Sequence, residues 1–245
     1  MEGLQSPDVR RWQDGHWQKV PESVASEERI RIVWSEGEAF LWAWPDDLGT
    51  LCLGHALLEY AGNRGTPVGS VGGQVLSLSD EPGKRIFQVR LSPLPAAEES
   101  ARLVEPGTLS PDSLLHAMRR FLELPGSCPG LWKATGCFHR AGLFDVRCSS
   151  FVCLAEDTGR HNCLDRLVGW ACLHGVLPGN HVLFLSSRIT GSLLTRAKRA
   201  GFCFLVGRGA VTSVGLDDGM TVVGFCRPGE GRFTVFQDAG CRVLG

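Results

Sequence analysis

The sequence predicts an α/β protein with a largely parallel sheet, helices on the faces of that sheet, and a smaller β-rich subdomain before it. Three observations predict this class. From about Leu143 onward, short apolar runs alternate with helical patterns, as in crossover connections between parallel strands. Before residue 97 the apolar residues recur mainly with a period of two. With 245 residues, 43% of them apolar and 21% charged, the chain can bury a full core.

The first part of the chain carries strand patterns around one helix. Residues 1–28 are polar and rich in charge, so we expect a loose start. In residues 29–44 apolar and polar side chains alternate on both sides of Ser35-Glu36-Gly37, which predicts a β-hairpin. Pro45-Asp46-Asp47 then opens a helix with leucines on one face, and Gly62 ends it.

A second pair of strands is expected before the core domain. Residues 65–92 alternate weakly and are broken by Gly72-Gly73 and Pro82-Gly83, which favours two strands around a turn. Residues 93–100 have the composition of a connector. We therefore divide the chain into a loose segment at 1–28, a β-rich subdomain at 29–96 and an α/β core domain at 97–245.

Helices and strands alternate in the core domain. Ser110-Pro111-Asp112 begins a helix, because a hydroxyl can cap it and proline suits its first turn, and this helix ends near Pro125-Gly126. The elements expected after it are strands at 150–154, 182–185, 202–206, 220–225 and 232–236, with helices at 165–174 and 192–200.

Composition excludes several classes of function. A formal net charge of −1 gives no basic field to attract nucleic acid or an anionic membrane. No apolar run approaches the roughly 18 residues that cross a bilayer, and the first thirty residues lack a signal-peptide core, so we expect a cytoplasmic protein. The ten cysteines stand mostly singly among apolar residues, as buried reduced thiols do, and no C-x-x-C spacing supports a metal site.

Polar loops follow the expected strands, where α/β sheets bind ligands. In the loop 156–165, Arg160 could clamp a phosphate and His161 could exchange a proton, with Glu156 or Asp165 orienting either. A charged turn that only caps the next helix is the alternative, although an Arg-His-Asn core exceeds what capping needs.

Three later loops, at residues 186–192, 207–213 and 225–233, repeat this chemistry, and each also has a plain interpretation as a helix cap or a hairpin turn. Together at one sheet edge they favour a phosphate-bearing ligand. The residues that we expect to bind it there are Ser186, Ser187, Arg188, Thr212, Ser213, Phe225, Cys226, Arg227, Pro228, Gly229 and Arg232.

Cys137 and His139 form a further candidate pair. The imidazole stands two residues from the thiol and could lower its pKa, which would favour the thiolate. A cysteine packed as a small apolar residue is the alternative that residue type alone favours.

These segments together resemble the FdhD family of formate dehydrogenase accessory sulfurtransferases. The similar segments are Trp44-Pro45-Asp46-Asp47-Leu48, Thr135-Gly136-Cys137-Phe138-His139, Glu156 to Asp165 with its Gly-Arg-His-Asn core, Ser186-Ser187-Arg188, and Phe225 to Gly229 with Arg232. The resemblance implies a three-layer α/β/α, cytidine-deaminase-like core in a homodimer. It also implies binding of the molybdenum bis(molybdopterin guanine dinucleotide) cofactor, sulfur received from a cysteine desulfurase, and delivery for formate dehydrogenase.

One departure from the family leaves two functions open. The family carries sulfur on a Cys-Gly-x-Cys-Gly loop ahead of the Thr-Gly-x-x-His segment, whereas residues 90–110 of this chain contain no cysteine. Either another cysteine carries sulfur, with Cys137 and His139 as the catalytic candidates, or the chain is a cofactor-binding chaperone without sulfur transfer. Zinc-dependent deamination is excluded by the missing P-C-x-x-C and H-x-E pattern.

Overall fold

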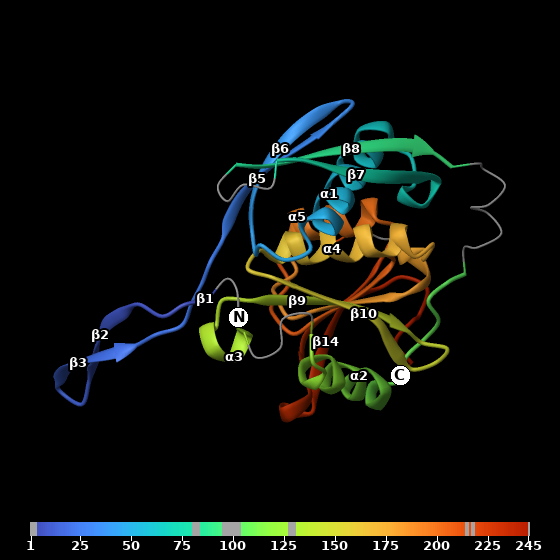
Figure 1. Cartoon of the computed structure of the whole chain (residues 1–245). Helices are drawn as coiled ribbons and strands as arrows, with labels where there is room; N and C mark the ends of the chain where they lie inside the picture. Colours follow the sequence, from blue (N-terminus) through green and yellow to red (C-terminus); the bar gives the residue numbers. More distant parts are fainter. Residues whose placement is uncertain are drawn as a thin grey trace.

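The computed structural model describes residues 4–79, 84–94, 104–126, 131–213, 216 and 219–244. Its centre is a six-stranded sheet in the order β10-β9-β11-β12-β13-β14 (Figure 1). The strands are β9 (His139–Asp145), β10 (Ser150–Asp157), β11 (Val182–Leu185), β12 (Phe204–Gly207), β13 (Thr221–Arg227) and β14 (Arg232–Asp238). The α/β class predicted from the sequence is confirmed.

The expectation of a largely parallel sheet is wrong, because the sheet is mixed. Only β11, β12 and β13 run parallel. The pairs β9–β10, β9–β11 and β13–β14 are antiparallel. Short connections join β9 to β10 and β13 to β14, and a short connection between neighbouring strands permits only the antiparallel arrangement. The strand β9 was not predicted from the sequence.

Helices cover both faces of this sheet. The helices α1 (Leu48–Arg64), α4 (Arg160–Leu173) and α5 (Gly191–Arg199) lie on one face, and α2 (Pro111–Glu123) lies on the other (Figure 1). The predicted start of α2 is confirmed: the Ser110 hydroxyl accepts a hydrogen bond from the Ser113 amide at 3.2 Å, and Pro111 occupies the first turn. A short helix, α3 (Leu131–Thr135), precedes β9.

A second sheet of four strands, in the order β6-β5-β8-β7, covers α1 from the outside (Figure 1). Its strands are β5 (Glu28–Trp34), β6 (Gly37–Ala43), β7 (Val71–Ser79) and β8 (Arg85–Pro93), which confirms the predicted hairpin and the predicted strand pair. The turn at Pro82-Gly83 and most of the expected connector at 93–100 lie outside the described residues. One hydrophobic core joins residues of both sheets, from Ile30 to Val222.

The helices α1 and α4 cross at two glycines that permit backbone contact. A Cβ atom on Gly54 would lie 1.8 Å from the Asp165 carbonyl oxygen, and one on Gly169 would lie 2.0 Å from the Thr50 carbonyl oxygen. Since real Cβ contacts are never so short, only glycine fits at either position. This crossing fixes α4, whose first turn carries Arg160 and His161.

The start of α4 differs from the prediction. The helix was expected to begin at Asp165 but begins at Arg160, because Asp157 accepts a hydrogen bond from the Gly159 amide at 3.0 Å and closes the turn before it. Arg160 and His161 therefore belong to the first turn of a helix rather than to a loop.

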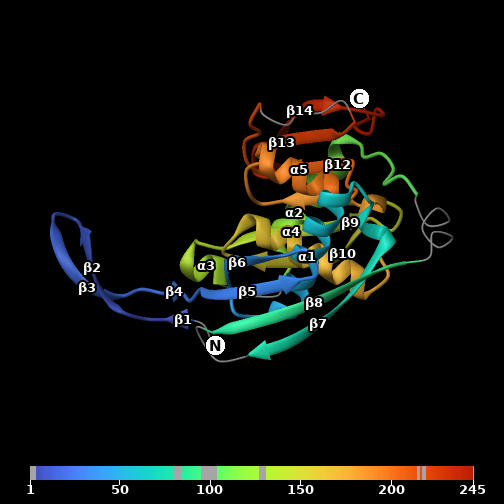
Figure 2. The ribbon, with the colours of Figure 1, turned by 90° about the horizontal axis from the view of Figure 1, so that it is seen from above.

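The N-terminal segment is an ordered β-ribbon, so the expected loose start is wrong. It consists of β1 (Leu4–Gln5), β2 (Asp8–Gln13), β3 (His16–Pro21) and β4 (Val24–Ala25), and β2 and β3 project away from the body (Figure 2). Asp14 and Gly15 have φ of 52° and 80°, as a tight hairpin turn requires, and the Trp12 and Trp17 rings pair across the strands at 5.4 Å. The polar composition of residues 1–28 gave no indication of this hairpin.

Candidate functional site

The predicted ligand-binding loops meet at one edge of the central sheet. Asp157 at the end of β10 is paired with His139 at the start of β9. The Ser186 amide after β11 donates to the Arg140 carbonyl at 3.0 Å, and the Arg208 amide after β12 donates to the Leu185 carbonyl at 2.9 Å. We call this the ligand edge. The opposite edge, where β9 ends and β10 starts, carries none of the predicted binding residues.

At the start of α4, Asp157 and Arg166 form a buried structural pair. The Arg166 Nε donates to Asp157 Oδ2 at 2.9 Å, and the other guanidinium nitrogens donate to the carbonyls of Trp44, Asp46 and Asp47. Asn162 Nδ2 donates to Asp157 Oδ1 at 2.9 Å. These contacts tie the first turn of α4 to the segment before α1 and leave Arg160 and His161 available for other roles.

The carboxylates expected to orient Arg160 and His161 do not do so. Glu156 is paired with Arg140 at 2.5 Å. Asp165 is paired with Arg196, whose Nε lies 2.5 Å from Asp165 Oδ1, and with His55 at 2.9 Å. That expectation was wrong because the partners come from other strands and helices, which local spacing cannot reveal.

A positive cluster of Arg160 and Arg188 occupies the ligand edge, together with the imidazole of His139. Burial lowers the pKa of His139 below its ordinary value, and the nearby charges of Arg160 and Arg188 lower it further, against the opposing effect of Asp157. The Arg160 Nε is buried and has no hydrogen-bond partner within the described part of the chain. A buried N–H donor without a partner costs free energy, and an anionic ligand would satisfy it.

His161 lies beside this cluster. Burial is the main cause that lowers the pKa of His161, followed by the charges of Arg160 and Arg196, while Asp165 raises it. The ring Nε2 lies 3.1 Å from the Ser192 hydroxyl on the first turn of α5. At neutral pH the imidazole is therefore neutral.

The two serines after β11 are engaged with backbone. Ser186 Oγ accepts a hydrogen bond from the Arg140 amide at 2.8 Å, which joins the β11 loop to β9. Ser187 is buried, and its hydroxyl donates to the Arg188 carbonyl at 3.1 Å. Of the Ser186-Ser187-Arg188 segment, the exposed Arg188 side chain has the greatest freedom to meet a ligand.

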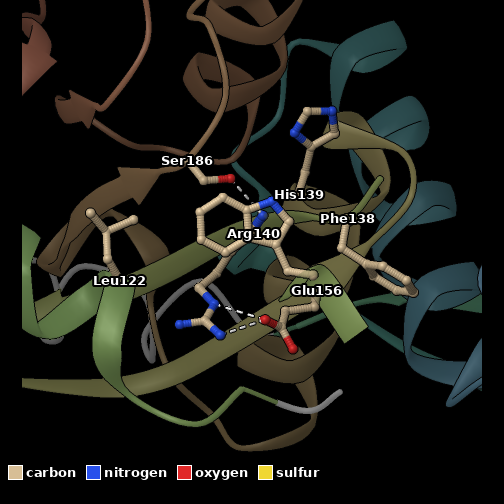
Figure 3. Close-up of a pocket in the computed structure, with 7 residues that line it drawn as sticks. Leu122, Phe138, His139, Arg140, Glu156 and Ser186 are labelled. Atoms are coloured by element: carbon tan, nitrogen blue, oxygen red, sulfur yellow. Dashed lines mark hydrogen bonds and ion pairs between the residues drawn. The ribbon is translucent and has the colours of Figure 1, made fainter. Parts of the chain in front are cut away.

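A small cavity beside His139 belongs to the structural framework. Its volume is about 10 Å³, enough for about one water molecule. Figure 3 shows the Arg140 guanidinium bonded to Glu156, the Ser186 hydroxyl bonded to the Arg140 backbone amide, and His139 directed away from the ion pair.

Arg140 also donates to the carbonyls of Phe121 and Leu124, so it fastens the end of α2 to the sheet. The sequence signal for Arg140, a single arginine within the apolar run after His139, was overlooked.

The loop between β13 and β14 lies at the same edge, two strands from β11. Arg227 and Arg232 each bond Glu230, at 3.1 Å and 2.6 Å. Cys226 is fully buried, and desolvation raises the pKa of its thiol to about 12, so this side chain packs in the core. The loop turns at Phe225, with φ of 49°, and through a 3-10 turn at Pro228-Gly229-Glu230. Thr212 and Ser213 are exposed near this edge. Ligand binding by these residues stays a prediction.

Cys137 lies at the ligand edge, in the turn between α3 and β9. Its Sγ is exposed and donates to Thr135 Oγ1 at 3.1 Å. It lines a cavity of about 390 Å³ together with Glu27, Thr158 and the base of the N-terminal ribbon. The imidazole of His139 lies close to the charges of Arg160 and Arg188. The catalytic roles of Cys137 and His139 stay a prediction.

Two further findings limit the chemistry of the described residues. Among them, no group of three or more His, Cys, Asp and Glu side chains is placed to hold a metal ion. No helix in the described ranges is both long enough and apolar enough to span a bilayer.

Comparisons with known proteins point to one family. A family model described as "FdhD/NarQ family" matches residues 87–242. The "Sulfur carrier protein FdhD" of Chromobacterium violaceum is 30% identical, over 92% of this chain and 93% of that protein. The "Protein FdhD" of Methanocaldococcus jannaschii is 28% identical over 43% of this chain and 47% of that protein.

A solved structure has the same fold. It is described as a "putative formate dehydrogenase accessory protein" from Desulfotalea psychrophila, and it superimposes with a TM-score of 0.75 at 22% identity. The match covers 99% of this chain and 100% of the other.

Proposed function

Because this chain belongs to the FdhD/NarQ family, we propose that it is an accessory protein of formate dehydrogenase maturation, which carries sulfur and binds a molybdenum pterin guanine dinucleotide as its cargo. The observation that carries the proposal is the positive cluster of the ligand edge. A buried guanidinium N–H without a partner, beside a neutral imidazole and a second arginine, suits the diphosphate of such a cargo.

Two sources of positive charge would act on the diphosphate. The helices α4 and α5 both begin at the ligand edge, and their first-turn N–H groups carry partial positive charge. Arg160 and Arg188 add full charges, and arginine can bind two phosphate oxygens at once. Neutral His139 can donate or accept one hydrogen bond without adding charge.

Cys137 is the best candidate to carry sulfur. Of the described cysteines, Cys137, Cys148 and Cys241 are exposed. Cys148 lies in the turn between β9 and β10, and Cys241 follows the end of β14, so both lie at the opposite edge. Sulfur would arrive when the Cys137 thiolate attacks the outer sulfur of a persulfide on a cysteine desulfurase. A new S–S bond forms on Cys137, the donor S–S bond breaks, and the donor leaves as a thiolate.

One observation favours the alternative of a binding chaperone without sulfur transfer. The family's sulfur-carrying loop would fall within residues 90–110, which contain no cysteine. The end of this segment is instead fixed to the C-terminal segment: the Leu109 amide donates to the Arg242 carbonyl at 2.9 Å, and Glu105 pairs with Arg242 at 2.7 Å.

Calorimetric titration with GDP and with pyrophosphate tests cargo binding. We expect Arg160→Ala to weaken binding about tenfold or more, since a hydrogen bond to a charged group contributes about 1.5–3 kcal/mol. Arg119→Ala, on the exposed face of α2, is the matched control and should bind as the wild type does. Absence of binding by the wild-type chain would remove both candidate functions.

Sulfur carriage is tested separately. The chain is incubated with a cysteine desulfurase and ³⁵S-cysteine, and the labelled peptide is mapped by mass spectrometry. We expect label on Cys137, its loss in Cys137→Ser, and its retention in the control Cys148→Ser. If no cysteine is labelled while nucleotide still binds, the chaperone function replaces sulfur transfer. The homodimer implied by the family remains a prediction that sedimentation velocity can check.

A further inference from the structure

His161 is held by a chain of hydroxyl groups that links two helix starts. Its Nε2 lies 3.1 Å from Ser192 Oγ, and Ser192 Oγ lies 3.2 Å from Thr190 Oγ1. His161 is on the first turn of α4, while Thr190 and Ser192 are at the start of α5. The imidazole ring is thus fixed at one nitrogen by a residue of another helix.

Burial and two nearby arginines favour the neutral form of the His161 ring. Arg160 and Asp165 face it from α4, and Arg196 faces it from α5. Burial lowers the pKa of His161 most, the two arginines lower it further, and Asp165 opposes them. The Asp165 carboxylate bonds Arg196 and His55 instead of the His161 ring. Ser192 is therefore the residue whose hydrogen bond to the ring bears on the choice of tautomer.

The field of α5 sets the direction of the Ser192 hydrogen bond. The free N–H groups of the first turn make the helix start positive, so the hydroxyl oxygen turns toward them and the hydrogen turns outward. A hydrogen that points outward would be directed at His161 Nε2, 3.1 Å from Ser192 Oγ. Thr190 can then donate its own hydroxyl hydrogen to Ser192 Oγ, and a chain of hydrogen bonds that all run one way is strengthened by mutual polarisation.

We propose that Ser192 is a positioning residue that holds neutral His161 as the Nδ1–H tautomer. Ser192 donates to Nε2, and the Nδ1–H group is left to donate to an anionic ligand at the ligand edge. The role toward the ligand rests on the proposed cargo binding. The tautomer itself is a property of the free protein.

Long-range ¹H–¹⁵N correlation spectra of ¹⁵N-histidine-labelled protein test the proposal without any ligand. The chain has 7 histidines, and the spectrum of His161→Gln identifies the signals of His161. We expect the Nδ1–H pattern in the wild type. In Ser192→Ala the ratio of the tautomers should shift about fivefold toward Nε2–H, the equivalent of the roughly 1 kcal/mol that one hydrogen bond contributes. The pKa of His161 should rise, because a donor to its basic nitrogen is gone.

Two variants separate positioning from folding. Ser192→Thr keeps the hydroxyl and should restore the wild-type tautomer. Thr195→Ala removes another exposed hydroxyl from α5, one that donates to the Gly191 carbonyl, and should leave His161 unchanged. An Nε2–H pattern in the wild type, or the same tautomer ratio in Ser192→Ala, would overturn the proposal.

A pH series of pyrophosphate titrations connects the tautomer with binding. If the cargo site is as proposed, Ser192→Ala should bind pyrophosphate a fewfold more weakly at neutral pH, and Ser192→Thr should recover that loss. If no variant binds pyrophosphate, the proposed function fails, while the tautomer measured on the free protein still decides the role of Ser192.

Discussion

Replacing Gly169 with alanine tests the helix crossing that places Arg160 and His161 at the ligand edge. The new Cβ atom would lie 2.0 Å from the Thr50 carbonyl oxygen and 2.9 Å from the Thr50 carbonyl carbon. Both are backbone atoms of α1, so no side-chain rotation can relieve the contact. The helices must separate, or α4 must shift along α1.

The size of the effect follows from two opposing contributions. Overpacking a core typically costs about 1–3 kcal/mol, and a backbone-to-backbone contact belongs at the upper end, about 3 kcal/mol. Alanine is favoured over glycine within a helix by about 1 kcal/mol, which leaves a net loss of about 2 kcal/mol. In a domain of this size about 2–4 °C corresponds to each kcal/mol, so the melting temperature should fall by about 4–8 °C.

Gly49→Ala is the matched control for this measurement. Gly49 lies on the first turn of α1, and nothing lies within 4 Å of a Cβ atom built on it. The same substitution should therefore leave the melting temperature unchanged or slightly raised. Thermal unfolding followed by circular dichroism, together with urea titration, gives both values. Equal stability of Gly169→Ala and Gly49→Ala would refute the proposed packing.

Three further predictions use other parts of the structure. Arg166→Ala leaves the buried Asp157 carboxylate without its charged partner, so urea unfolding should show a loss of about 3–5 kcal/mol, and a loss below 1 kcal/mol would contradict the buried pair. The Arg147 guanidinium lowers the pKa of Asp145 from 3.8 to about 2, so the stability that this carboxylate contributes is present above pH 3.8 and is lost as the pH falls toward 2. The stability difference between the wild type and Asp145→Asn, measured by urea titration, should therefore shrink over that range, and a constant difference would exclude this linkage. N-ethylmaleimide at neutral pH, with peptide mapping, should label the exposed thiols first and spare those that burial protects; fast labelling of a buried thiol would contradict the structure. The exposed thiols are Cys137, Cys148 and Cys241, and the protected ones are Cys52, Cys163 and Cys226.

Local sequence signals predicted a large part of the fold. The cap and the apolar spacing of 111–123 predicted α2, and alternation predicted the hairpin of 28–43, because these signals act between residues a few positions apart. The polar segments after the strands were predicted to meet, and β9, β10 and β11 do bring His139, Arg160 and Arg188 together. Segments such as Gly159-Arg160-His161-Asn162 also indicated the family, which the comparisons then showed.

Tertiary structure alone decided which side chains of the site are free and which are already paired. In the sequence Glu156, Asp165 and Ser186 look like equal candidates for the site. In the fold, however, Glu156 forms an ion pair with Arg140. Asp165 pairs with Arg196 and with His55, which lies 110 positions away in the chain. Such pairs depend on the packing of whole helices and strands, on which spacing along the chain carries no information. The sequence therefore named the residues of the ligand edge. Only the packed structure showed that the buried Arg160 Nε has no hydrogen-bond partner among the described residues and that His161 lies against Ser192.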